Sequence, residues 1–257
     1  MKLAIFLPNW VGDAVMATPA LRVLRQHFAH ATILGVLKPY VAGVLHGAPW
    51  LDQCLLLTSD GPWSQRWPAV AAGLRRERVD LAILFANTFR SALVAYLGGC
   101  RRRVGYVRHG RRFLLTDRLQ HATDRRGRRF PQPEIEAYNR LVESVGCPSP
   151  SYRMELFTTI RDEAAAVAVW RQAGFERYPE VVCLNPGGAF GSAKHWPTDY
   201  FATLARELAD RRGSGVLVLC GPAERETARQ IAREARSAAV HTLADQPLSL
   251  GLTKACV

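Results

Sequence analysis

Short apolar runs alternate along the chain with longer segments in which apolar residues recur at helical spacing. The runs predict strands at 2–7, 31–37, 80–85, 104–106, 180–184, 215–220 and 239–242. The periodic segments predict helices at 14–28, 41–46, 67–78, 90–97, 160–173, 198–212 and 224–236. Alternation of strand and helix is typical of βαβ units around a parallel sheet. The pattern therefore indicates an α/β protein.

The alternation is interrupted once, over 146–158, where Pro148 and Pro150 mark a connection. We therefore expect two Rossmann-like domains, 1–157 and 158–257. The second series has only about three strands, and the sequence ends in a helical segment without a following strand. A doubly wound domain of roughly 150 residues needs more strands. We expect a second domain that is truncated at its C-terminal end.

A glycine-rich loop, LNPGGAFGSAKHWP at 184–197, follows the first strand of the second series and precedes a helix. Glycines such as Gly187 and Gly188 let backbone N–H groups approach an anion, and a helix N-terminus favours negative charge. Lys194 adds a mobile positive charge. The loop is neither a GxxxxGK[ST] nor a GxGxxG motif, so it predicts a different type of phosphate-binding loop.

The first strand is followed by PNWVGDAVMATPAL at 8–21. Gly12 permits a tight turn, and Asp13 then lies at the mouth of a helix, at the sheet edge where ligands bind in α/β folds. Asp13 is a candidate catalytic carboxylate, and helix capping is the alternative. Thr18-Pro19 indicates either a kink or a shortened helix.

Two other strand ends carry polar residues. FANTFRSALVAYLGG at 85–99 places Asn87, Thr88 and Ser91 at the same edge as Asp13, with helix capping by Asn87 or Thr88 as the alternative. CGPAERE at 220–226 places Glu224 or Glu226 where an acidic residue can bind a ribose diol. For this glutamate the alternative is a favourable charge in a first helical turn.

The net charge of +12 is uneven, because eleven arginines lie between Arg101 and Arg129 against two aspartates. Such an Arg-rich window indicates an anionic partner or a solvated loop face. The six cysteines are scattered without a CxxC pair, which is typical of a cytoplasmic protein with reduced thiols. In the sequence we find no His, Cys, Asp and Glu residues at the spacing of a metal site, no apolar run long enough to span a membrane, and no signal peptide.

Four motifs occur in an order that resembles a known family. They are PNWVGDAVMATPAL, FANTFRSALVAYLGG, RRVGYVRHGRRFLLTD at 102–117 and LNPGGAFGSAKHWP. Together they resemble the ADP-heptose:lipopolysaccharide heptosyltransferases of glycosyltransferase family nine, and among these heptosyltransferase II. The resemblance covers nearly the whole chain, and four colinear motifs are far more specific than any one of them.

The resemblance implies a GT-B fold whose N-terminal domain binds the acceptor and whose C-terminal domain binds the ADP-sugar. It implies an inverting, metal-independent transfer of heptose from ADP-L-glycero-D-manno-heptose to the inner-core heptose of lipopolysaccharide. No cofactor is expected beyond this donor substrate. The enzyme would be cytoplasmic and peripheral at the inner face of the membrane, with nucleic acid an unlikely partner.

The resemblance also assigns roles to residues. Asp13 matches the general base and Lys194 the phosphate-binding lysine, with Gly187, Gly188 and Glu224 completing the donor site. The acceptor-binding residues would be Gly12, Asn87, Ser91 and Arg108. From their charge, Arg103, Arg111 and Arg112 are further candidates for contacts to an anionic acceptor or to the membrane.

Family members continue with a further strand and a D-[ST]-G-P-x-H-like loop that contacts the donor diphosphate, and this motif does not occur in the chain. Two alternatives to the function of a heptosyltransferase stay open. One is another family-nine transferase that uses a different sugar nucleotide. The other is a non-catalytic protein that binds an anionic ligand.

Overall fold

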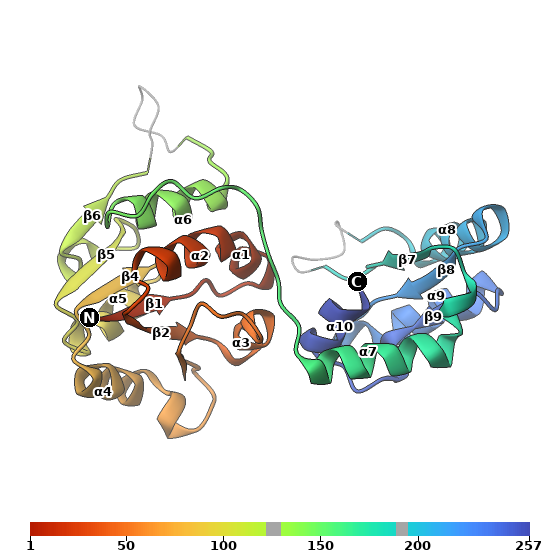
Figure 1. The fold of residues 1–257 in the computed structure, drawn as a ribbon, viewed down its shortest axis with the longest axis horizontal. Coiled ribbons are helices and arrows are strands. Elements are labelled where there is room, and N and C mark those ends of the chain that lie inside the picture. Colours follow the sequence, from red (N-terminus) through yellow and green to blue (C-terminus); the bar gives the residue numbers. More distant parts are fainter. Residues whose placement is uncertain (122–129, 189–194) are drawn as a thin grey trace. The chain divides into compact units, whose positions relative to one another are not determined.

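The computed structural model describes residues 1–121, 130–188 and 195–257. The chain divides into two compact units, Met1–Phe157 and Thr158–Val257 (Figure 1). Each unit is built around its own parallel sheet. No helix in the described ranges is both long and apolar enough to cross a bilayer.

The first unit contains a six-stranded parallel sheet in the order β3-β2-β1-β4-β5-β6. Its strands are β1 (Lys2–Phe6), β2 (Thr32–Leu37), β3 (Gln53–Leu56), β4 (Leu81–Leu84), β5 (Arg102–Tyr106) and β6 (Asp117–Leu119). The order reverses between β1 and β4, so the connections leave these neighbouring strands in opposite directions. A crevice is expected at the carboxyl ends of the strands at such a switch point.

In the described part of the first unit, six α-helices connect these strands and cover both faces of the sheet (Figure 1). They are α1 (Val11–Met16), α2 (Thr18–His27), α3 (Pro39–Leu45), α4 (Trp67–Glu77), α5 (Phe89–Leu97) and α6 (Glu134–Glu143). Alternate strand residues such as Ala4, Phe6 and Leu84 pack with α4 and α5 in one buried cluster. Because side chains alternate across a strand, Leu3 and Ile5 are buried on the opposite face.

The structure shows elements of the first unit that the apolar pattern does not predict. The strands β3 and β6 are short, and their QCLL and DRL sequences leave several positions exposed. Helix α6 follows the Arg-rich window and was also missed. The segment 14–28, expected as one helix, is two helices, because Pro19 lies in the first turn of α2 and cannot continue α1.

The second unit has a three-stranded parallel sheet, β7-β8-β9, with α8 packed against α9 and α7 packed against α10. The strands are β7 (Val181–Leu184), β8 (Gly215–Val218) and β9 (Val240–Thr242). The helices are α7 (Ile160–Ala173), α8 (Thr198–Arg212), α9 (Arg225–Ala235) and α10 (Leu250–Cys256). The bounds of α7 and α8 are those expected, and a 3₁₀ turn at Pro222–Glu224 precedes α9.

A fully buried arginine holds the loop between β4 and α5. The Arg111 guanidinium donates from Nε to the Tyr106 carbonyl at 2.9 Å and from Nη1 to the Ala86 carbonyl at 2.6 Å. Its Nη2 donates to Asn87 Oδ1 at 2.8 Å. Burial, and secondarily the like charge of Arg108, lower the pKa of Arg111 to about 10. The expectation that Arg111 contacts an acceptor or a membrane is wrong, because its side chain is enclosed.

Arg111 is accommodated because β5 has a glycine where the guanidinium passes. A Cβ atom at Gly105 would lie 3.2 Å from Arg111 Nη2. The same guanidinium reaches the Thr88 carbonyl at 3.2 Å and Ser91 Oγ at 3.3 Å. Arg111 thus fixes several groups at the carboxyl end of β4 at once.

We expect Arg111→Met to lower the free energy of unfolding by about 3 kcal/mol, because it leaves buried carbonyl groups without a donor. Urea denaturation of the chain measures this value. The matched control is Arg112→Met on an exposed neighbour, which should change stability by less than about 0.5 kcal/mol. Equal losses in the two variants would show that the buried network does not stabilise the unit.

Candidate active site

Asp13 lies in the first turn of α1, the helix that follows the carboxyl end of β1. The residue at the N-cap position is Trp10, so Asp13 is not the N-cap. The carboxylate is half-buried, and burial raises its pKa, with a further contribution from the negative charge of Glu134. Asp13 also interacts electrostatically with Tyr138, which α6 contributes together with Glu134.

A raised pKa suits a carboxylate that must accept a proton. A general base works best when its pKa lies close to the operating pH. Burial, and secondarily Glu134, bring the pKa of Asp13 closer to neutral pH than that of an ordinary aspartate. The position and the environment of Asp13 are therefore compatible with proton abstraction from a hydroxyl group.

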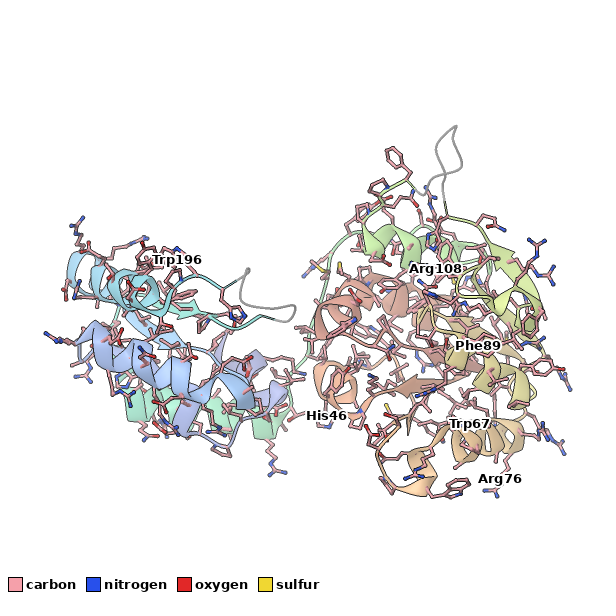
Figure 2. All side chains as sticks on the ribbon, turned by 180° about the vertical axis from the view of Figure 1, so that it is seen from behind. His46, Trp67, Arg76, Phe89, Arg108 and Trp196 are labelled. Atoms are coloured by element: carbon pink, nitrogen blue, oxygen red, sulfur yellow. The ribbon has the colours of Figure 1, made fainter. Side chains whose placement is uncertain are left out.

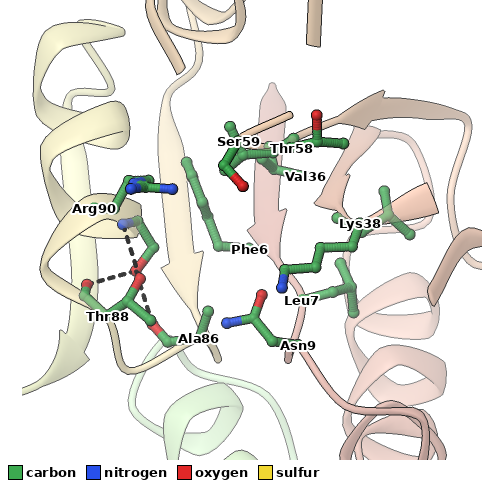
Figure 3. A pocket seen from close by; sticks show the side chains of 13 residues that line it. Phe6, Leu7, Asn9, Val36, Lys38, Thr58, Ser59, Ala86, Thr88 and Arg90 are labelled. Carbon is green, nitrogen blue, oxygen red and sulfur yellow. Dashed lines mark hydrogen bonds between the residues drawn. The ribbon is translucent and has the colours of Figure 1, made fainter. Parts of the chain in front are cut away.

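A pocket of about 330 Å³ opens at the switch point of the first sheet (Figure 3). Its walls come from residues at or beyond the carboxyl ends of β1, β2, β3 and β4. The lining includes Phe6, Leu7, Asn9, Val36, Leu37, Lys38, Leu57, Thr58, Ser59, Ala86, Thr88, Arg90 and Ser91. Its volume is within the range of small-molecule sites.

The pocket combines an apolar floor with polar groups around it. Lys38 and Arg90 approach it from different elements, and Asn9, Thr58 and Ser59 add amide and hydroxyl groups (Figure 3). Among the described residues, Lys38 and Arg90 make no ion pair with a carboxylate. Two such cations at one pocket favour an anionic ligand. Sequence reasoning missed both residues, although each follows a predicted strand.

The four acceptor-binding candidates follow the carboxyl ends of β1, β4 and β5, so they belong to one edge of the sheet. Ser91 is buried and lines the pocket, but its hydroxyl already donates within the loop. Asn87 is oriented by Arg111, and Thr88 rather than Asn87 caps α5. Arg108 is half-buried and lies beyond β5 (Figure 2).

Gly12 is not in the tight turn expected from sequence. It lies within α1 rather than in a turn, and a Cβ atom there would meet no atom within 4 Å. The prediction that Gly12 permits a tight turn after the first strand is therefore wrong. The open space beside Gly12 instead leaves the backbone near Asp13 accessible.

In the second unit, the glycine loop after β7 lies against the turn after β8. A Cβ atom at Gly187 would lie 3.2 Å from Glu224 Cγ. The next residue, Gly188, accepts a hydrogen bond from His195 Nε2 at 2.9 Å through its carbonyl. Gly187, Gly188 and Glu224 are thus brought together at the carboxyl edge of the sheet. Lys194 lies outside the described residues.

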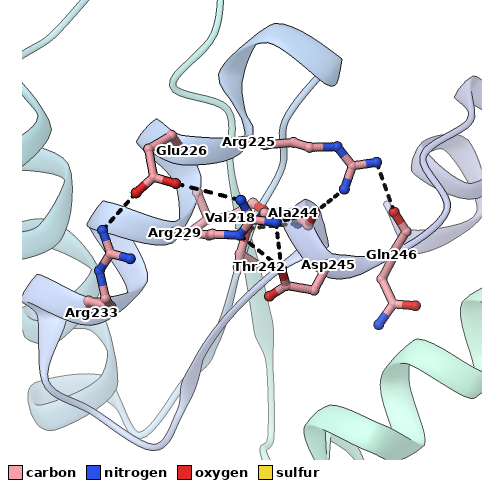
Figure 4. Close-up of polar contacts among 9 residues, drawn as sticks. All are labelled: Val218, Arg225, Glu226, Arg229, Arg233, Thr242, Ala244, Asp245 and Gln246. Atoms are coloured by element: carbon pink, nitrogen blue, oxygen red, sulfur yellow. Dashed lines mark hydrogen bonds and ion pairs between the residues drawn. The ribbon is translucent and has the colours of Figure 1, made fainter.

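The alternative acidic residue, Glu226, faces a different environment. It forms ion pairs with Arg233 at 2.8 Å and Arg229 at 3.5 Å on the surface of α9 (Figure 4). Arg233, and to a smaller extent Arg229, lower the pKa of Glu226. Because its carboxylate is paired while Glu224 borders the glycine loop, the geometry favours Glu224 as the ligand-binding carboxylate.

No group of three or more His, Cys, Asp and Glu residues within the described ranges is arranged to hold a metal ion. The six cysteines are free thiols. Burial raises the pKa of the Cys100 thiol to about 12, with a smaller opposing effect from Arg103, which disfavours the reactive thiolate. The described polar groups that could act on a substrate are carboxylates, cations, amides and hydroxyls.

Comparison with known proteins supports the two-unit architecture. The chain is 26% identical over 246 residues to lipopolysaccharide heptosyltransferase 2 of Escherichia coli K12, covering 90% of the chain and 66% of that protein. The structure of E. coli ADP-heptose LPS heptosyltransferase II matches with a TM-score of 0.78 and 22% identity, covering 100% of this chain and 76% of that one. E. coli heptosyltransferase WaaC with ADP matches with a TM-score of 0.69 and 20% identity, covering 95% and 74%.

The expected GT-B type of α/β architecture is confirmed by these structural matches. The chain spans only 61–68% of the length of the curated relatives that it matches. A family model described as glycosyltransferase family 9 (heptosyltransferase) matches residues 67–249, which include the Arg-rich window and the glycine loop. This chain therefore belongs to glycosyltransferase family 9, the heptosyltransferase family.

Proposed function

We propose that the chain takes part in transferring heptose from ADP-L-glycero-D-manno-heptose to the inner-core heptose of lipopolysaccharide. The reaction inverts the anomeric centre and needs neither a metal nor a cofactor besides the donor substrate. The observation that carries this proposal is the environment of Asp13. A half-buried carboxylate with a raised pKa, next to open space at Gly12, can accept the proton of an attacking hydroxyl.

The first unit binds the acceptor. A sugar hydroxyl is a poor nucleophile until a base removes its proton, and Asp13 supplies that base beside the accessible backbone of Gly12. Asn87, Ser91 and Arg108 belong to the same sheet edge and position the acceptor. The neighbouring pocket with Lys38 and Arg90 suits the anionic groups of an inner-core oligosaccharide.

The second unit binds the ADP-sugar. As the glycosidic bond breaks, negative charge grows on the leaving diphosphate, and N–H groups of the Gly187-Gly188 loop with the Lys194 ammonium stabilise that charge. Glu224 accepts hydrogen bonds from the ribose diol. This assignment is supported by the contact of Gly187 with Glu224 and by the fold shared with a relative described with ADP.

The acceptor is a glycolipid, so the enzyme works at the inner face of the cytoplasmic membrane. The net charge of +12 supports association with an anionic surface. A related enzyme with another sugar nucleotide would retain the same base and diphosphate loop. Saturable binding of ADP-heptose, with weaker binding of other ADP-sugars, distinguishes the proposed donor from this alternative.

We expect Asp13→Asn to lower heptose transfer at least 100-fold, because the amide cannot accept the proton. Calorimetric ADP affinity should change less than about twofold, since Asp13 acts on the acceptor. In the unchanged protein, transfer should fall as pH decreases through the pKa of Asp13, and burial shifts this loss to a higher pH than for a solvent-exposed aspartate. Near-normal transfer by the variant would exclude Asp13 as the base.

Glu224→Gln should weaken ADP binding about tenfold, because a charge-assisted hydrogen bond to the ribose becomes a neutral one. The control is Glu226→Gln, only two residues away, whose carboxylate is already paired with Arg229 and Arg233. That variant should bind ADP within about twofold of the original chain. If Glu226→Gln instead weakened ADP binding more than Glu224→Gln does, the ribose contact would belong to Glu226.

Lys194→Ala should weaken binding of ADP about tenfold or more, because the substitution removes the ammonium group that contacts the diphosphate. Adenosine affinity should change little, since adenosine has no phosphate. Titration calorimetry with both ligands separates the effects. An unchanged dissociation constant for ADP would exclude Lys194 as a residue that binds the donor.

A further inference from the structure

Helix α4 and the turn before it form an exposed surface rich in tryptophan and arginine. We call it the α4 surface, and it consists of Trp63, Arg66, Trp67, Arg75, Arg76 and Arg78. Trp63 is 66% exposed and Trp67 is 42% exposed. The helix buries Val70, Ala71 and Leu74 against the sheet, so it packs normally on its other side.

Two hollows of about 620 and 570 Å³ flank this helix and share Ala72 and Arg76. The first is lined by Trp67, Pro68 and arginines of the last turn of α4 and its C-cap, and the second by Trp63 and the exposed edge of β3. Small residues such as Ala72 and Gly73 leave room between the large side chains. Trp67 and Arg76 mark this side of the unit in Figure 2.

The charge of the α4 surface is little compensated. Within the described residues, the side chains of Arg76 and Arg78 form no ion pair and donate no hydrogen bond. Arg75 donates to the Leu97 carbonyl at 2.6 Å, which leaves its charge unneutralised. The nearby Glu77 carboxylate is already paired with Lys2 at 2.6 Å. The surface therefore offers positive charge beside exposed aromatic rings.

The α4 surface is also connected to the pocket of the first sheet. Thr58 and Ser59 line that pocket, whereas Trp63 and Gln65 line a hollow beside α4. The loop between them is closed by a hydrogen bond from the Thr58 N–H to the Gln65 carbonyl at 2.8 Å. Four residues of extended chain span at most about 14 Å, so Ser59 and Trp63 are no farther apart than this.

The Arg-rich window is a weaker candidate for membrane contact. In its described part, Arg111 is buried, Arg102 pairs with Asp117 at 2.9 Å and Arg103 donates to backbone carbonyls. The guanidinium groups of these three arginines are thus engaged in contacts within the fold. Arg112 and Arg118 are exposed and form no ion pair within the described residues, so they provide a matched comparison, whereas Arg101 pairs with Asp80 at 3.5 Å.

We propose that the α4 surface docks the enzyme on a lipid bilayer containing anionic headgroups. Tryptophan prefers the interface between headgroups and acyl chains, and each nearby arginine gains from the negative surface potential. Docking there presents the adjacent pocket to a sugar that a lipid holds at the membrane. The inference rests on the proposed function only for the identity of that acceptor.

Sedimentation with lipid vesicles tests the proposal on the whole chain. We expect binding to phosphatidylcholine vesicles that contain one quarter phosphatidylglycerol, and much weaker binding to pure phosphatidylcholine. Arg76→Gln with Arg78→Gln should weaken binding about 25-fold, or about fivefold for each charge removed. Trp63→Ala should weaken it further, including at a salt concentration that screens surface charge.

The control is Arg112→Gln with Arg118→Gln, which removes the same charge from exposed, unpaired arginines in the described part of the Arg-rich window and should weaken binding less than threefold. Circular dichroism verifies that each variant folds. Equal losses in the two double variants, a larger loss in the control, or absence of binding to anionic vesicles would each overturn the proposal. ADP affinity should be unchanged in Arg76→Gln/Arg78→Gln, so a failure of docking is distinguishable from a failure of the proposed transfer reaction.

Discussion

Parallel pairing of β1 with both β2 and β4 is the constraint on which the first unit depends. Parallel strands end at one edge, so residues that are far apart in sequence become neighbours there. Asp13 follows β1, Lys38 follows β2 and Asn87 follows β4. The reversal of strand order opens the pocket at the same place. The chemistry of this unit is therefore a consequence of topology.

The loops at this sheet edge also need hydrogen-bond donors, because their backbone carbonyl groups are not paired within a strand or helix. Arg111 supplies this support by donating to the carbonyls of Ala86 and Tyr106 and to the amide oxygen of Asn87. Burying a guanidinium is unfavourable unless its donors are satisfied. Here several acceptors converge on it, and Gly105 leaves space for its passage. An arginine from a basic segment thus serves as a structural residue.

The second unit applies the same principle with fewer strands. The ends of β7 and β8 bring Gly187 against Glu224, and the 3₁₀ turn at Pro222–Glu224 sets the direction of that glutamate. Two residues later, Glu226 lies on the helix surface and pairs with arginines. A difference of two positions therefore separates a side chain at the sheet edge from one engaged on the helix. The donor role itself remains a proposal.

The sequence by itself determined the α/β class, most strands and helices, and the family to which the motifs point, because periodicity and local motifs are encoded by neighbouring residues. It missed β3, β6 and α6, whose weak or polar patterns become structure only through pairing and packing. Only the tertiary structure decided that Arg111 is buried and that burial, with a smaller effect of Glu134, raises the pKa of Asp13. It also decided that Lys38 and Arg90 share a pocket. Burial and charge interactions depend on residues distant in sequence, which local patterns do not specify.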